Sequence, residues 1–259
     1  MQNKTIWLID QYASTPGSGI GGGGRHYYLA KELVKKGYNV FVMAAGYTHL
    51  LSEPKKIDGE YIIEQEDGVN FVWFKVPEYS TAHDRKRIAN WFIFIYKLIK
   101  HNSSFEKPDI VLASSPSPFV FLAAKYIAKK YKSKLVFEVR DIWPLTLIEL
   151  GGVSPLHPFI LLMKWVEKKA YLESDVILSN LPFAIEHIKK YGVSRDKFHW
   201  LPNGFSKNEM DSADPLSEHE IIKLPSSNFI IGYTGTLGVA NAMCYLIETA
   251  IILKDHADI

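Results

Sequence analysis

The sequence predicts an α/β fold in which a doubly wound parallel sheet is followed by the start of a second, similar domain. Residues 5–43 read as strand, glycine-rich loop, helix and strand, a βαβ unit whose right-handed crossover makes its two strands parallel. Strands and amphipathic helices then alternate as far as Leu201, which favours helices on both faces of one sheet. A strand at 228–233, a loop at 234–238 and a helix that ends at about Asp255 then repeat the layout of the opening unit.

The opening unit predicts a binding site between its first strand and its helix. The strand 5–10 ends on Asp10, the loop 17–24 holds six glycines, and the helix covers residues 25–36. Ligands bind outside the carboxyl ends of parallel strands, where this loop lies. The first backbone N–H groups of a helix lack intrahelical partners and carry the positive end of its dipole. We therefore expect a crevice at residues 10–26 for an anionic or hydroxyl-rich ligand.

The remaining elements follow from hydrophobic period and turn chemistry. Residues 61–76 alternate around Asp67-Gly68, which is typical of a β-hairpin. The basic, amphipathic helix 84–101 has two interpretations, either a helix that packs on the core or a helix that lies on an anionic membrane. The other predicted strands are 39–43, 109–113, 134–139, 175–179 and 197–201. The other predicted helices are one that ends at Lys130, 158–173 with Leu161, Leu162, Trp165 and Val166 on its apolar side, and 182–191.

A change in composition marks the end of this series. Residues 205–227 are rich in Ser, Asp, Glu and Pro and show little periodicity apart from a short helix at 215–222. We therefore divide the chain into an N-terminal domain at 1–204, a linker at 205–227 and the start of a C-terminal domain at 228–259. One βα unit cannot bury its own apolar face, so we expect this second domain to be incomplete.

Charge is distributed unevenly along an otherwise ordinary globular composition. The chain of 259 residues has a net charge of +2, but residues 205–259 hold three Lys/Arg against eight Asp/Glu, so the first 204 residues hold 27 against 20. This basic portion suits an acidic ligand or an anionic membrane. Cys244 is the single cysteine, no signal-peptide pattern opens the chain, and no apolar run approaches the roughly 18 residues that span a bilayer. We expect a cytoplasmic protein with peripheral contact at the inner face of the plasma membrane.

The glycine loop matches a dinucleotide-binding pattern in spacing but not in context. Gly17-x-Gly19-x-x-Gly22 fits the fingerprint, yet six residues separate it from Asp10. The second strand is followed by Ala44-Ala45, with no carboxylate to hold a ribose. A nicotinamide or flavin site is therefore disfavoured. The alternative is a plain glycine linker. The position of the loop between a strand and a helix argues against that alternative.

The segment 137–144 is the second group of candidate functional residues. Alternation places Phe137 and Val139 on one face of the strand and leaves Glu138 and Arg140 on the other, with Asp141 at its carboxyl end. Such a group can form the rim of an active site. It can equally form a structural ion pair, and both interpretations stay open.

Five motifs in order resemble family 4 glycosyltransferases of GT-B fold over essentially the whole chain. They are Ile9-Asp10-Gln11-Tyr12, the glycine run into Arg25-His26, the segment 138–144, Leu201-Pro202-Asn203-Gly204 and Gly235-Thr236-Leu237-Gly238. The branch that the sequence resembles most is the bacterial amino-sugar or fucosamine transferases of surface-polysaccharide assembly. The resemblance implies two Rossmann-like domains, the first for the acceptor and the second for a nucleotide-sugar.

The resemblance also implies which residues form the site. Substrate would lie against Tyr12, Arg25, Glu138 and Arg140 and against the glycines Gly21, Gly22, Gly23 and Gly24. The nucleotide side would include Gly235, Thr236 and Gly238. Relatives often have a His-Asp pair where this chain has Arg140-Asp141; because arginine stays protonated, Asp141 is the candidate catalytic residue that orients or deprotonates the acceptor hydroxyl.

The implied function is sugar transfer with retention of configuration, from a nucleotide-sugar to a glycolipid or oligosaccharide acceptor in lipopolysaccharide or capsule synthesis. The nucleotide-sugar is a substrate, and no metal, cofactor or nucleic acid is expected. Relatives hold the donor with an Arg, a Lys and a Glu-x7-Glu segment beyond the position of Ile259, so we expect this chain alone to be inactive. One alternative is a Rossmann-type nucleotide-sugar dehydratase or epimerase, for which Tyr96 and Lys100 supply a Tyr-x-x-x-Lys pair. A second alternative is a non-catalytic binding module.

Overall fold

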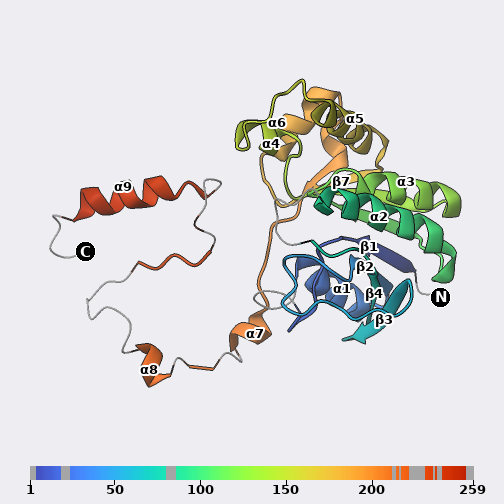
Figure 1. Cartoon of the computed structure of the whole chain (residues 1–259), viewed down its shortest axis with the longest axis horizontal. Coiled ribbons are helices and arrows are strands. Elements are labelled where there is room, and N and C mark those ends of the chain that lie inside the picture. The colour runs from blue at the N-terminus through green and yellow to red at the C-terminus, as the bar shows by residue number, and fades with distance from the viewer. Residues whose placement is uncertain are drawn as a thin grey trace. The chain divides into compact units, whose positions relative to one another are not determined.

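A computed structural model of the chain describes residues 4–18, 24–79, 86–211, 214–215, 217–221, 231–235, 237 and 241–254. The chain separates into two compact units. The first comprises Met1–Ile148 and Val153–Gly204, and the second comprises Glu149–Gly152 and Phe205–Ile259. Figure 1 shows the chain coloured from the N-terminus in blue to the C-terminus in red.

Eight strands of the described residues form one mostly parallel sheet in the order β3-β4-β2-β1-β5-β6-β7-β8. The hairpin partner β3 is antiparallel to β4, and the other pairs are parallel. The register places Ile9 beside both Met43 and Ala113, so these strand ends lie level. The strands are β1 (Thr5–Ile9), β2 (Asn39–Ala45), β3 (Tyr61–Glu66), β4 (Val69–Phe74), β5 (Ile110–Ser114), β6 (Lys134–Val139), β7 (Val176–Ser179) and β8 (Phe198–Trp200).

Helices connect these strands, and their ends follow ordinary capping chemistry. Pro158 opens α5 at its first turn, where the side chain of His157 accepts the N–H of Phe159 at 3.2 Å. Gly37, with φ of +86°, follows the end of α1. The helices of the first unit are α1 (Arg25–Lys35), α2 (Lys86–His101), α3 (Val120–Tyr131), α5 (Pro158–Glu173) and α6 (Ala184–Ile188), with α4 (Leu145–Glu149) at its boundary. The 3₁₀ turns are η1 (Asn102–Ser104), η2 (Lys189–Tyr191) and η3 (Arg195–Lys197).

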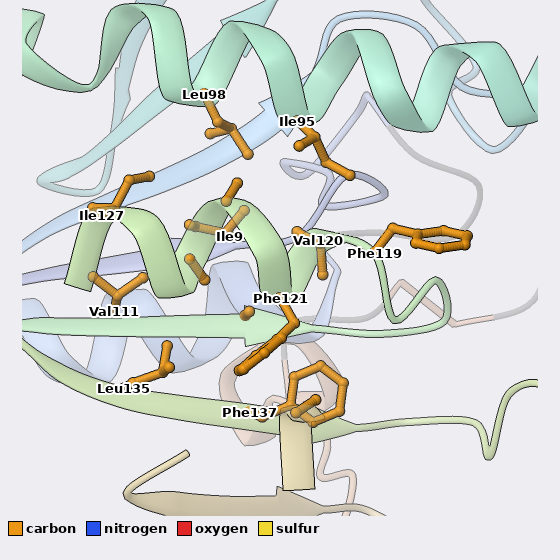
Figure 2. Packing of buried hydrophobic residues seen from close by; sticks show 14 of the residues in the cluster. Ile9, Ile95, Leu98, Val111, Phe119, Val120, Phe121, Ile127, Leu135 and Phe137 are labelled. Carbon is orange, nitrogen blue, oxygen red and sulfur yellow. The ribbon is translucent and has the colours of Figure 1, made fainter. Parts of the chain in front are cut away.

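The sheet separates two apolar cores. Helices α2, α3, α5 and α6 pack on one face, and Figure 2 shows Ile95 and Leu98 of α2 and Ile127 of α3 above the strands β1, β5 and β6. Helix α1 packs on the opposite face through Tyr27 and Ala30. The two-sided cover confirms the predicted doubly wound α/β fold. Helix α1 begins beside the carboxyl ends of the central strands.

Most predicted elements of the first unit are present, with differences at their ends. The hairpin is confirmed and turns at Asp67 and Gly68, whose φ angles of +49° and +78° are typical of the tight two-residue turn. The helix predicted at 182–191 is shorter, because it begins at Ala184 and passes into a 3₁₀ turn at Lys189. The five-residue α4 was not predicted, because it is too short to show a period.

The second unit contains three helices among its described residues. They are α7 (Lys207–Asp211), α8 (Glu218–Ile221) and α9 (Met243–Leu253). Helix α9 lies within the helix that was predicted after Gly238, and α8 lies within the short helix predicted in the linker. Of the strand predicted at 228–233, residues 228–230 lie outside the described residues, and 231–233 have no regular structure. The domain limits at 204 and 228 stay predictions.

Helix α2 packs on the core, so the first of its two interpretations is confirmed. Trp91, Phe94, Ile95 and Leu98 are buried, and the basic residues near its end pair with Glu60. Trp91 is therefore unavailable to a lipid surface. Among the described helices, none combines the length and apolar character that crossing a bilayer requires.

Helix α5 is rotated relative to the prediction. Of the residues assigned to its buried side, Val166 is buried, whereas Leu161, Leu162 and Trp165 are exposed. The buried side instead carries Ile160, Met163, Val166, Glu167, Ala170 and Tyr171. The helix has two apolar stripes, and period alone does not determine which of them faces the sheet.

Two neighbouring substitutions test this orientation. We expect Met163→Asp to lower the free energy of unfolding by about 3 kcal/mol or more, because the fully buried side chain becomes an unpaired charge. Leu162→Asp, at a position that is 44% exposed, should change it by less than about 1 kcal/mol. Urea unfolding of both variants provides the measurement, and equal losses would contradict the orientation.

Candidate functional site

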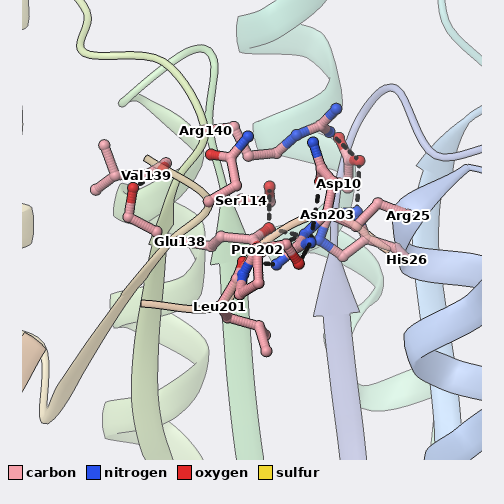
Figure 3. A network of polar contacts seen from close by, with 12 residues as sticks. Asp10, Arg25, His26, Ser114, Glu138, Val139, Arg140, Leu201, Pro202 and Asn203 are labelled. Atoms are coloured by element: carbon pink, nitrogen blue, oxygen red, sulfur yellow. Dashed lines mark hydrogen bonds and ion pairs between the residues drawn. The ribbon is translucent and has the colours of Figure 1, made fainter. Parts of the chain in front are cut away.

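Polar side chains lie at the ends of three adjacent strands on the face that α1 covers. In β1, β5 and β6 the apolar residues Leu8, Leu112 and Val136 contact the core of this face. Two residues further along each strand, the same face carries Asp10, Ser114 and Glu138. Because β1, β5 and β6 are neighbours in the sheet, these three polar residues converge at one edge (Figure 3).

His26, in the first turn of α1, joins two of these residues. Its Nε2 lies 2.7 Å from Oε2 of Glu138, and its Nδ1 lies 2.8 Å from Oδ2 of Asp10. The second contact has ion-pair distance without good hydrogen-bond geometry. The hydroxyl of Ser114 donates to the same Glu138 oxygen at 2.7 Å. His26, Asp10 and Glu138 are all buried, so their charges interact with little screening by water.

The protonation states of this cluster follow from burial and the opposing charges. Burial alone would lower the pKa of His26, but the carboxylates of Asp10 and Glu138 outweigh it and raise this pKa to about 9. Burial would raise the pKa of the Glu138 carboxyl, yet His26, Ser114 and Arg25 hold it well below its usual range. The pKa of Asp10 is lowered in the same way, against burial, by His26 and Arg140. The cluster is therefore an imidazolium between two carboxylates at neutral pH.

Arg25 connects this cluster to the last segment of the first unit. Its Nε donates to Oε1 of Glu138 at 2.9 Å. Its terminal nitrogens donate to the carbonyls of Leu201 at 2.7 Å and Pro202 at 2.8 Å, and to the side chain of Asn203 at 3.0 Å (Figure 3). The guanidinium predicted to bind substrate is thus engaged by protein acceptors. It positions residues 201–203 beside the strand ends.

Arg140 and Asp141 face solvent at the end of β6. The Arg140 guanidinium donates to Oδ2 of Asp10 at 3.0 Å while its side chain stays 33% exposed. The Asp141 carboxylate is exposed and has no hydrogen bond or ion pair with any residue that the structure describes. The hydroxyl of Ser115 accepts the backbone N–H groups of Arg140 at 2.8 Å and of Asp141 at 3.3 Å, and these bonds fix the direction of the segment. Asp141 therefore presents a carboxylate that is free to meet a ligand.

Tyr12 lies next to the cluster and is held from two sides. Its backbone N–H donates to Oδ1 of Asp10 at 2.9 Å. Its hydroxyl accepts Nε of Arg87 at 3.0 Å and Nε1 of Trp91 at 2.8 Å, so helix α2 fixes its ring. Tyr12 remains partly exposed and shares the strand edge with Asp10 and Arg140.

The glycine positions divide into described and undescribed ones. Gly24 is the N-cap of α1, and a Cβ there would lie 3.0 Å from Oγ of Ser14, so this glycine serves close packing. Gly235 has a φ of +153° beside the ring of Tyr233 in the second unit. The other glycines and the threonine assigned to binding lie outside the described residues; they are Gly21, Gly22, Gly23, Thr236 and Gly238.

Sequence reasoning did not assign roles to His26, Asp10 and Ser114, which are central to the cluster. The available signal was the polar residue that ends each of three apolar strands. Converting this signal into a cluster requires the strand order β1-β5-β6, which brings residues 10, 114 and 138 together. The roles of the predicted site residues toward a ligand stay predictions.

The fold is that of GT-B glycosyltransferases. Sucrose-phosphate synthase from Thermosynechococcus elongatus superposes with a TM-score of 0.59 at 13% identity, covering 86% of this chain and 53% of that one. The catalytic domain of starch synthase IV from Arabidopsis thaliana, bound to ADP and acarbose, gives 0.54 at 13% identity, covering 80% and 52%. UGT89C1 from the same plant, complexed with UDP-L-rhamnose, gives 0.50 at 12% identity, covering 88% and 56%. The chain thus spans about half the length of these structures.

The family model described as Glycosyltransferase Family 4 matches residues 20–209, which is most of the chain. The chain therefore belongs to glycosyltransferase family 4. Comparison with curated protein sequences found no match. The matched segment begins within the glycine loop and contains α1 with His26, all of β6, and the Arg25 contacts at 201–203.

Because folding stabilises the charged form of His26, we expect the free energy of unfolding to fall as the pH becomes alkaline. The folded pKa of about 9 exceeds the unfolded value near 6.5, so the stabilisation is complete below pH 6.5 and is lost as pH rises through 9. We expect a loss on the order of 3 kcal/mol between pH 6.5 and 9.5. Urea unfolding at both pH values checks it.

A matched pair of variants isolates the contribution of this residue. His26→Gln should abolish most of the pH dependence between 6.5 and 9.5, whereas His199→Gln, at an exposed position, should leave it intact. If wild type and His26→Gln lose the same stability across this range, His26 is not the buried imidazolium described above.

Proposed function

We propose that this chain supplies the acceptor-binding side of a retaining glycosyltransferase that transfers a sugar from a nucleotide-sugar to a glycolipid or polysaccharide precursor. The parent reaction would belong to bacterial surface-polysaccharide synthesis, such as lipopolysaccharide or capsule, at an anionic membrane surface. The observation that carries the proposal is the free Asp141 carboxylate beside a buried cationic cluster, at the sheet edge of a family 4 domain. The nucleotide-sugar is a substrate in this proposal, and no metal or cofactor takes part.

The electrostatics of the cluster suit an acceptor that carries phosphate. Its three cations, Arg25, His26 and Arg140, exceed its two carboxylates, Asp10 and Glu138, by one positive charge. The start of α1 adds the positive end of a helix dipole without an acidic residue in its first turn. Arg140 is the cation that solvent reaches, so it would contact the anionic group of the acceptor.

Asp141 is the group that would act on the acceptor hydroxyl. Glu138 is unsuited to this role, because it is fully buried and accepts from His26, Arg25 and Ser114. A carboxylate within hydrogen-bond reach of the attacking hydroxyl orients it and removes its proton as the new bond forms. Solved structures of similar fold are bound to ADP and acarbose or to UDP-L-rhamnose, which is consistent with a nucleotide-linked donor here.

The alternative of a nucleotide-sugar dehydratase or epimerase has no support from the structure. Its Tyr-x-x-x-Lys pair, Tyr96 and Lys100, lies on the surface of α2, where Lys100 pairs with Glu60 at 3.1 Å. The family match is to transferases.

Substitutions at the end of β6 test the proposal in protein from the intact gene. Asp141→Asn should lower kcat by about 100-fold or more, as expected for loss of general-base assistance. Arg140→Gln should raise KM for a phosphate-bearing acceptor about tenfold and change KM for the donor little. The assay follows labelled sugar from a panel of nucleotide-sugars into membrane lipid, with the product anomer assigned by NMR.

The control is Glu66→Gln, which removes an exposed carboxylate in the hairpin strand β3 and should leave kcat unchanged. Retention of more than a third of the activity by Asp141→Asn would remove Asp141 from the mechanism. Absence of transfer to any lipid or saccharide by the wild-type protein would contradict the proposed function itself.

A further inference from the structure

The outward face of helix α5 is apolar although nothing described covers it. Leu161, Trp165, Lys168 and Leu172 recur at helical spacing on this face, and Leu162 adjoins them. Trp165 is 52% exposed and Leu161 48% exposed. The opposite side of α5 is also apolar and packs on the core. The helix is therefore apolar on both its buried and its exposed side. A helix with this property normally has a partner on each side.

The layer to which α5 belongs is strongly basic. Helices α2, α3 and α5 cover the same face of the sheet. Together they carry ten Lys/Arg against two Glu, and one of these, Glu167, is buried. The three helices thus carry an excess of eight positive charges, of which Lys97 and Lys100 pair with Glu60, and Lys125 and Lys169 pair with Glu173. Helix α1, on the opposite face, has three Lys/Arg and one Glu, in addition to the buried imidazolium of His26.

On α5 itself, lysines surround the exposed apolar residues. Lys164 and Lys168 have no ion-pair partner among the described residues. Nζ of Lys169 lies 4.9 Å from the centre of the Trp165 ring and pairs with Oε1 of Glu173 at 3.2 Å. Tryptophan and leucine flanked by lysine are typical of helices that rest in the interface of an anionic bilayer. A protein partner of matching character would need an acidic rim around an apolar centre, whereas an anionic bilayer provides both over any area.

Aromatic contacts connect this face to the candidate site. Trp143, two residues beyond Asp141, contacts the ring of Trp91 at 5.7 Å between centroids. Trp91 contacts Phe119 at 6.5 Å, and Phe119 contacts Phe159 in the first turn of α5 at 5.6 Å. Because Trp91 and Phe119 are buried, these rings belong to the core and connect the first turn of α5 rigidly to the segment that carries Asp141.

We propose that the outward face of α5, formed by Leu161, Leu162, Trp165 and Leu172 with Lys164, Lys168 and Lys169, docks on an anionic lipid bilayer. On α2, by comparison, Trp91 is buried and the exposed aromatic residues are Phe92 and Tyr96. The proposal rests on the proposed function in one respect, because it names the surface by which the transferase would reach a lipid-linked acceptor. Membrane binding itself is measurable without any transfer reaction.

Vesicle flotation of the chain tests the proposal with charge and apolar variants. Wild type should bind vesicles of phosphatidylcholine with 30% phosphatidylglycerol, bind pure phosphatidylcholine at least tenfold more weakly, and dissociate at 0.5 M NaCl. Trp165→Glu should reduce binding to anionic vesicles at least tenfold. So should the double variant Lys164→Glu, Lys168→Glu, since each lysine near such a surface contributes about fivefold.

Matched controls carry the same chemical changes elsewhere. Ile63→Glu, at a β3 position that is 51% exposed, and Lys36→Glu, beyond the end of α1, should bind as wild type does. Circular dichroism melts establish that each variant is folded. Equal loss of binding in the controls, or no binding of wild type to anionic vesicles, would overturn the proposal.

Light scattering identifies the competing occupant. A wild-type dimer that Trp165→Glu converts to monomer, without lipid binding, would assign the α5 face to a second copy of the chain and overturn the proposal. Transfer to a water-soluble acceptor analogue by protein from the intact gene does not require the bilayer. Failure of lipid docking and failure of the transferase function are therefore distinguishable.

Discussion

The contact between His26 and Glu138 is the interaction on which the arrangement of the strand ends depends. Glu138 is fully buried at the end of β6, and an ionised carboxylate there requires cations and hydrogen-bond donors in its immediate surroundings. His26, Arg25 and Ser114 provide them from α1 and β5. Because His26 also faces Asp10, the same imidazolium fixes the ends of β1 and β6 relative to the start of α1. Arg140 and residues 201–203 are then positioned by groups already held in this cluster.

This arrangement separates structural charges from those available to a ligand. The buried carboxylates Asp10 and Glu138 are engaged by cations, and Arg25 is engaged by the segment that ends the first unit. Arg140 contacts both Asp10 and solvent. The Asp141 carboxylate is exposed and has no hydrogen bond or ion pair with any described residue. A site for sugar transfer needs both a rigid cationic environment and a carboxylate that can move a proton. The sheet edge combines buried ion pairs with one exposed carboxylate, which is the pattern that the proposed function requires.

The sequence was sufficient for the fold and insufficient for the geometry of the cluster. The strand periods of the first unit and the Asp67-Gly68 turn are local signals that appear in the structure where expected, whereas the helix predicted to open at Pro182 begins at Ala184. The partnership of His26 with Asp10 and Glu138 depends on strand order, because 112 residues separate His26 from Glu138. The predicted orientation of α5 was wrong because the helix is apolar on two sides. Only its packing against the sheet determines which of these sides is buried. Arg25 and Glu138 were found by motif, but their engagement by the protein needed coordinates.

The positions of the strand ends thus depend on a buried His26 imidazolium that two carboxylates share. The most direct measurement is an NMR titration of the imidazole nitrogens of His26 in ¹⁵N-histidine-labelled protein, assigned by comparison with His26→Gln. We expect both nitrogens to carry protons at pH 7.5 and the ring to titrate with a pKa of about 9. A neutral tautomer at pH 7.5, with a transition near the value of 6.5 found for solvent-exposed histidine, would contradict it.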